Sequence, residues 1–101
     1  MNDRARERIE NVQVDSLVVA CRALMARLSR VHARFAKERE AGNLAMAQQL
    51  AKAHVETVDA LQDLLSVIDA DQSRPGASAE LKQGLTEVWA SAGKIGIGAL
   101  L

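Results

Sequence analysis

Few side chains in this chain of 101 residues could do chemistry, and they are widely spaced. His32 and His54 are the only histidines, and Cys21 is the only cysteine. A zinc site takes about four ligands from His, Cys and carboxylate side chains. The two histidines fall near one layer of the helical hairpin predicted below, but Cys21 lies about three helical turns away. The sequence therefore predicts no metal site, and both histidines are expected to have polar or packing roles at the border of a core.

The other reactive groups lack the neighbours that catalysis requires. Cys21 lies on an apolar stripe, so we expect a small buried residue; a reactive thiol, the alternative, would need a base beside it. Four carboxylates are typical of a solvated helix face: Asp59, Asp63, Asp69 and Asp71. Acid–base chemistry would require a pocket and a raised pKa around them. No set of nucleophile, base and orienting group can be assembled, so we expect neither an enzyme nor a bound cofactor.

Charge and glycine patterns argue against nucleic-acid and phosphate ligands. The chain has 13 basic and 13 acidic residues, whereas nucleic-acid binding depends on a basic surface. Gly93, Gly96 and Gly98 follow no strand and precede no Lys-Ser/Thr pair, so they form no phosphate-binding loop. A net charge of zero also gives little protection against self-association, which leaves a homodimer open.

The hydrophobic residues predict a small core and no membrane span. They make up 49% of the chain, but Phe35 and Trp89 are the only aromatic residues. The segment from Asn2 to Glu10 is too polar for a signal peptide, and no run approaches the roughly 20 apolar residues of a membrane span. We expect one cytoplasmic domain over residues 1–101 that does not contact a membrane.

Two apolar stripes, with steps of three and four residues, predict the fold. The first comprises Leu17, Cys21, Leu24, Leu28, Val31 and Phe35. The second comprises Leu44, Ala47, Ala51, His54, Val58, Leu61, Leu65 and Ile68. Such steps keep residues on one face of an α-helix and average 3.5, as in a coiled coil. Folding the chain back at Gly42-Asn43 aligns residues whose numbers add up to about 85, which predicts an antiparallel helical hairpin.

The pattern along the chain indicates an all-α fold, an antiparallel up-down bundle of three to four helices. One helix is expected from about Ser16, capped by Asp15 or Ser16, to Ala41, and a second from Leu44 to Ala70 with Asn43 as N-cap. A linker at 71–77 contains Pro75-Gly76, and Ser78 caps a third helix that ends near Gly93. The charged segment 1–11 forms a short helix or frays, and residues 11–15 are expected to break the helical pattern. The apolar, glycine-rich tail 93–101 docks on its own bundle or binds another chain.

Charges support the same register. Basic residues of the first long helix align with acidic residues of the second in three expected pairs: Arg22–Asp63, Arg27–Asp59 and Arg30–Glu56. Each exposed pair would contribute about 0–1 kcal/mol, so the pairs select the antiparallel arrangement more than they stabilise it. Because the third helix is short, part of the hairpin seam should stay uncovered and offer an apolar strip to a partner helix or a second copy.

Over residues 12–92 the chain resembles the flagellin export chaperone family. The resemblance is clearest at the turn Glu40-Ala-Gly-Asn-Leu44 and in the helix Gln49–Leu61, where Lys52-Ala53 and Asp59-Ala60-Leu61 match recognisable pieces. The segments 12–18, 65–69 and 79–89 add to it, with Val88-Trp89 in place of the family's Leu-Tyr. The resemblance implies a bacterial chaperone of the flagellum. Such a protein clasps the C-terminal segment of flagellin in the cytoplasm before type III export.

That function would work by binding a client helix in an apolar groove. We expect the partner-binding residues to lie on or beside the edges of the seam: Leu17, Val18, Leu24, Met25, Leu50 and Leu64. Met25 and Met46 would give such a groove adaptable side chains. The alternative is a self-associating structural or adaptor bundle, whose open strip is closed by a second copy.

Overall fold

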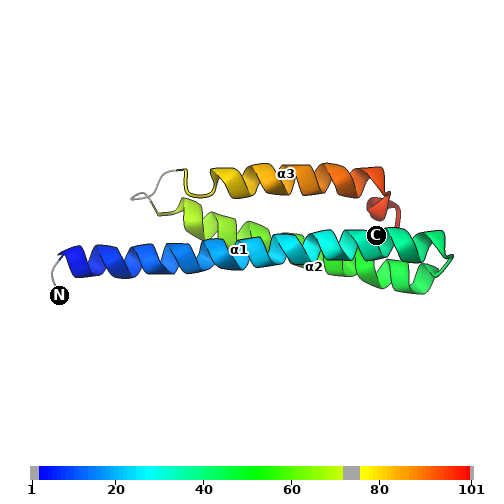
Figure 1. Cartoon of the computed structure of the whole chain (residues 1–101), viewed down its shortest axis with the longest axis horizontal. Coiled ribbons are helices and arrows are strands. Elements are labelled where there is room, and N and C mark those ends of the chain that lie inside the picture. The colour runs from blue at the N-terminus through cyan, green and yellow to red at the C-terminus, as the bar shows by residue number, and fades with distance from the viewer. Residues whose placement is uncertain (1–2, 72–75, 101) are drawn as a thin grey trace.

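The computed structural model describes residues 3–71 and 76–100, and the side chains from residue 14 onward. Three helices lie side by side: α1 (Asp3–Glu40), α2 (Leu44–Asp69) and α3 (Ala79–Lys94), followed by the single turn η1 (Ile97–Leu100). As Figure 1 shows, α1 and α2 form an antiparallel hairpin, and α3 runs along one side of it. The all-α prediction is confirmed, while the described residues contain no fourth long helix.

The first helix starts far earlier than the predicted Ser16. It runs without interruption from Asp3, so the expected break at residues 11–15 and the expected cap at Asp15 or Ser16 are wrong. That stretch holds neither Gly nor Pro, and polar residues there cost only a few tenths of a kcal/mol each in helix propensity. Val14 is buried and extends the apolar stripe by one step, which favours the longer helix.

The turn between α1 and α2 matches its sequence. Gly42 has a φ of 81°, and its N–H donates to the carbonyl of Arg39 while that of Asn43 donates to Glu38, the hydrogen bonds of a Schellman motif. The Asn43 side chain then accepts from the Met46 N–H at 3.4 Å, which confirms Asn43 as the N-cap of α2.

The core fills the seam of the hairpin in two adjoining clusters. The larger one contains Cys21, Leu28, Leu61 and Ile68, all of them fully buried. In the smaller one, fully buried Phe35 packs with Ala47 and Ala51, as the predicted register requires. The expected interior position of Cys21 is therefore confirmed.

The expected charge pairs between α1 and α2 are wrong. Arg22 instead lies 3.7 Å from Glu80 of α3. In the described part of the chain, neither Arg27 nor Arg30 forms an ion pair with α2. These side chains are exposed on the outer flanks of their helices, so matching height along the hairpin does not bring them together.

Ser78 is the N-cap residue of α3 as predicted, but its side chain makes no capping hydrogen bond. Its hydroxyl donates to the carboxylate of Asp69 at the end of α2, and Lys82 Nζ lies 2.6 Å from the same carboxylate. The contacts from Lys82 and Ser78 hold the pKa of Asp69 below its usual range. The start of α3 is thus tied to the end of α2; residues 72–75 of the expected linker lie outside the described residues.

The tail docks on its own bundle, the first of the two alternatives. α3 ends at Lys94, one residue beyond Gly93, and the chain turns at Gly96. Ile97 is buried against the cluster around Phe35, and Ile95 and Leu100 pack beside it. Arg39 Nη1 donates to the carbonyl of Ile95 at 2.7 Å. Within the described residues, no helix has the length and apolar character needed to cross a membrane.

Candidate functional site: the clefts beside α3

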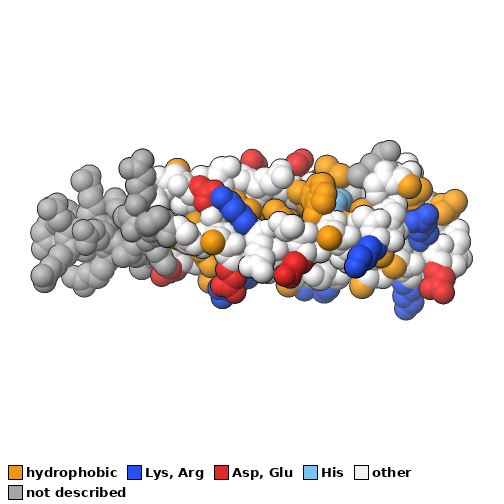
Figure 2. Space-filling model, turned by 90° about the horizontal axis from the view of Figure 1, so that it is seen from above, with side chains coloured by type: hydrophobic (Ala, Val, Ile, Leu, Met, Phe, Trp, Pro, Cys, Tyr) orange, Lys and Arg blue, Asp and Glu red, His pale blue; other side chains and the backbone are white. Residues whose placement is uncertain are grey.

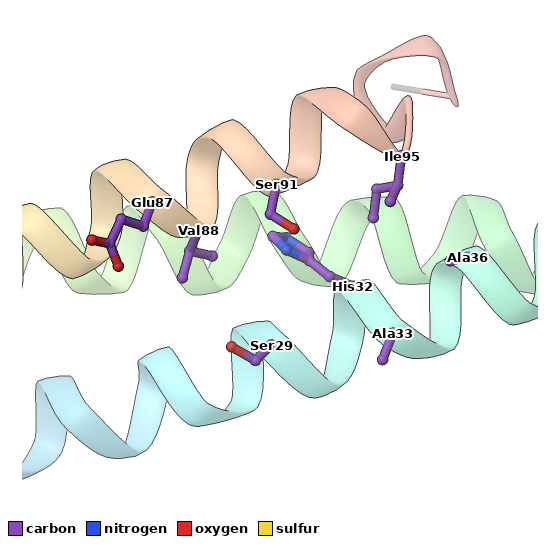
Figure 3. A pocket seen from close by; sticks show the side chains of 8 residues that line it. All are labelled: Ser29, His32, Ala33, Ala36, Glu87, Val88, Ser91 and Ile95. Atoms are coloured by element: carbon purple, nitrogen blue, oxygen red, sulfur yellow. The ribbon is translucent and has the colours of Figure 1, made fainter.

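Clefts flank α3 on both sides because this helix does not cover the full width of the hairpin. One cleft, of about 360 Å³, lies between α1 and α3 (Figure 3). Its lining comprises Ser29, His32, Ala33, Ala36, Glu87, Val88, Ser91 and Ile95. A second cleft, of about 430 Å³, lies between α2 and α3, and its wall is mainly apolar. These hollows are where a ligand or a partner side chain can enter.

A histidine pair lies beneath α3 and joins the two clefts. His32 of α1 and His54 of α2 are buried, and their ring nitrogens Nε2 and Nδ1 are 2.7 Å apart. Figure 3 shows His32 pointing from α1 toward Ser91 and Val88. His32 lines the α1–α3 cleft and His54 lines the α2–α3 cleft. The prediction that both histidines share a layer is confirmed.

Burial disfavours the protonated, charged form of this pair. Desolvation lowers the pKa of both imidazoles, and the nearby charge of His54 lowers the pKa of His32 further. One ring therefore donates its proton to the other in the neutral state. Glu87 lines the cleft next to His32, and Asp59 lines the cleft next to His54. The pair forms a polar contact in the centre of an otherwise apolar seam.

Trp89 forms the rim of the α2–α3 cleft. Its ring centroid lies 5.6 Å from that of His54, yet 54% of the residue is exposed. Val55, Val58 and Ile97 contribute to the apolar wall on the same side. Figure 2 shows hydrophobic side chains gathered beside the histidine surface on the face that carries α3. An aromatic side chain exposed over an apolar hollow is a typical anchor for a protein partner.

The α2–α3 cleft continues past Trp89 as a longer groove. A further hollow of about 400 Å³ lies on the other side of the indole and is lined by Gln62, Leu85, Thr86, Trp89 and Ala90. Gln62, Trp89 and Ala90 line both hollows, so the two adjoin along α3 with the indole of Trp89 between them. We call the combined feature the Trp89 groove. Its length along two helices suits a helical segment better than a small compact ligand.

The reactive side chains of the described residues lie apart or are already engaged. In the part of the chain that the structure describes, no three His, Cys, Asp or Glu side chains gather as metal ligands would. Burial raises the pKa of the Cys21 thiol and keeps it protonated, which makes it a poor nucleophile. Ser29 and Ser91 line the cleft of His32, but the ring nitrogen Nε2 of this histidine is engaged with His54.

The predicted partner-binding residues divide between two flanks of the hairpin. Met25 lies next to Gly84 of α3, and Val18, two turns earlier on α1, has the same orientation. Leu24 lies 100° around α1 from Met25, on the flank away from α3. Leu17, Val18, Leu24, Met25 and Leu64 are half-buried against the larger core cluster, and Leu50 against the smaller one.

None of these six residues lines the Trp89 groove. Sequence reasoning missed this groove because its walls depend on where α3 lies. The sequence signal that could have indicated the groove was Trp89 itself, the single tryptophan of the chain, which lies beside the apolar face of α3. Comparisons with protein-family models, curated proteins and solved structures find no match to this chain.

Proposed function

We propose that this protein is a non-enzymatic binding protein whose Trp89 groove holds an apolar helical segment of another protein. The observation that carries the proposal is the half-exposed indole of Trp89 between two apolar hollows. Tryptophan side chains of this kind supply a large share of the binding free energy in many protein interfaces. The helix-in-groove mode also matches the size and shape of the site.

The sequence resemblance selects the first client to test, the C-terminal segment of flagellin. On this proposal the protein acts in the bacterial cytoplasm and covers the apolar face of the client helix until type III export. The groove wall combines valines and Trp89 with the polar side chains of Gln62 and Asp59, which suits an amphipathic helix. A uniformly apolar segment would leave these polar groups unpaired, at a cost in binding free energy.

The experiment is a calorimetric titration of the purified protein with a flagellin C-terminal peptide. Trp89→Ala should weaken binding by about 2 kcal/mol or more, roughly thirtyfold, because the anchor is removed. Val55→Asp should weaken it as well, since Val55 lines the groove. Val19→Asp is the matched control, because Val19 is 66% exposed and lies on α1 outside the groove.

If the Trp89→Ala variant binds the peptide as tightly as the wild type does, the Trp89 groove is not the binding site. Circular dichroism of each variant separates loss of binding from loss of the helical fold. A peptide that fails to bind any form of the protein would reject flagellin as the client.

The second candidate function is a self-associating adaptor bundle. One observation favours it: arginines on α1 and carboxylates on α2 are exposed, and those on the flank away from α3 have no ion-pair partner among the described residues.

A further inference from the structure

We propose that the flank of the α1–α2 hairpin opposite α3 is a homodimer interface, occupied by a second copy of this chain. This flank, called the open face, comprises Ala20, Leu24, Arg27, Ala53, Ala60 and Leu64. The proposal is independent of the Trp89 groove, since it uses the other side of the hairpin.

Helix geometry separates the open face from the clefts. The α1 residues that line the clefts beside α3 include Met25 and His32, and the α2 residues include Val58 and Gln62. At 100° per residue, Leu24 lies on the other side of the seam from Met25. No residue of the open face lines any described cleft beside α3.

The open face is built for close helix packing. Ala20, Ala53 and Ala60 are half-buried, as are Leu24 and Leu64, so the hairpin leaves part of each side chain uncovered. Small residues let two helices approach to about 8 Å, at the short end of the usual interaxial range. Leu24 and Leu64 also belong to the residues predicted from sequence to bind a partner.

Charge complementarity identifies the occupant. Exposed Arg27, Arg30 and Arg34 follow the α1 edge of the open face, and exposed Glu56 and Asp63 follow the α2 edge. In the described structure none of these five side chains has an ion-pair partner. The protein therefore presents a basic edge and an acidic edge on either side of one apolar face. A second copy carries the matching pair of edges.

Symmetry then fixes the arrangement. A twofold axis parallel to the long axis of the hairpin places α1 of one copy opposite α2 of the other, and basic edges meet acidic edges. A twofold axis across the hairpin would place α1 against α1 and bring the arginines together. The charge pattern therefore selects the parallel axis, which also fixes the register, because rotation about it keeps every residue at its height.

The residue spacing agrees with that register. Along the open face, the α1 positions 20, 24 and 27 are spaced 4 and 3, and the α2 positions 64, 60 and 57 repeat these steps, with the Thr57 side chain itself buried in the hairpin. Each facing pair has residue numbers that add up to 84, close to the value of 86 for His32 and His54 within one chain. Ala20 thus faces Leu64 of the second copy, and Arg27 lies beside Glu56 of the second copy.

The test is charge reversal followed by sedimentation equilibrium on the full chain. Wild-type protein should be a dimer, and Arg27→Glu and Glu56→Arg should each raise the dissociation constant at least tenfold through like-charge contact. The double variant should return it to within a few-fold of wild type. Lys94→Glu, a charge reversal at an exposed residue of α3 on the opposite side of the hairpin, should have no effect.

A wild-type protein that stays monomeric at about 100 µM overturns the proposal, because that concentration would reveal even a weak dimer. So does a dimer that Arg27→Glu leaves intact, or one that Trp89→Ala dissociates, because the interface would then lie at the groove. All three charge-reversed residues are exposed, so the variants should keep the helical circular dichroism of the wild type.

Discussion

Acidification should weaken the fold through the buried pair His32–His54. Both imidazoles have a lowered pKa in the folded protein, so below the ordinary value of 6.5 the unfolded chain binds protons that the folded chain does not. The contribution of the two histidines to the free energy of unfolding is therefore fully present above pH 6.5. It is lost as the pH drops toward their folded pKa values. Each histidine contributes a loss of about 1.4 kcal/mol per pH unit within that window.

The size of the loss follows from the geometry. The two rings share one hydrogen bond of 2.7 Å. This bond can persist when one imidazole gains a proton, but it is lost when both imidazoles are protonated. Between pH 7.5 and 5.5 we expect a decrease of about 1–2.5 kcal/mol, a large share of the stability of a small domain.

The assay is urea unfolding at the two pH values, followed by circular dichroism. Replacing both histidines by leucine should abolish the difference between the two midpoints. The carboxylate of Asp69, whose pKa is lowered from 3.8, acts only in more acidic solution and does not interfere. Equal midpoints for the wild type, or histidine NMR titrations centred at pH 6.5, would refute this reasoning.

Three further predictions concern packing and capping. Asn43→Ala removes the side chain that accepts from the Met46 N–H and should cost about 1 kcal/mol in urea unfolding, whereas Asn43→Gly should cost only a few tenths. Ile97→Ala should cost about 2 kcal/mol, because Ile97 fixes the tail against the core, and unfolding that matches wild type would place the tail elsewhere. The Cys21 thiol should react with a disulfide reagent no faster than the protein opens, and immediate labelling of the native protein would contradict its burial.

The hairpin was predictable because its signals are local. Stripes with steps of three and four residues specify two helices, and Gly42-Asn43 specifies the turn. The register then placed His32 and His54 in one layer, where the structure joins them. The early start of α1 was missed because polar residues without Gly or Pro were interpreted as a helix break.

Long-range contacts account for the other differences. The Asn43 side chain caps α2 as its position predicts. The Ser78 hydroxyl instead donates a hydrogen bond to Asp69, nine residues earlier in the chain. The expected pairs of Arg22, Arg27 and Arg30 failed because register gives the height of a side chain and not its direction around the helix. The position of α3 across the linker cannot be read from local pattern, so the Trp89 groove emerges only from the structure.

The central claim is that the Trp89 groove holds a client helix. The chain contains one tryptophan, so a single indole N–H resonance reports on the groove. We would follow this resonance in ¹⁵N-labelled protein while adding a flagellin C-terminal peptide. The account predicts that it shifts and saturates together with the amides of Val55 and Ile97. An unchanged indole resonance, with shifts confined to Leu24 and Leu64 on the open face, would contradict it.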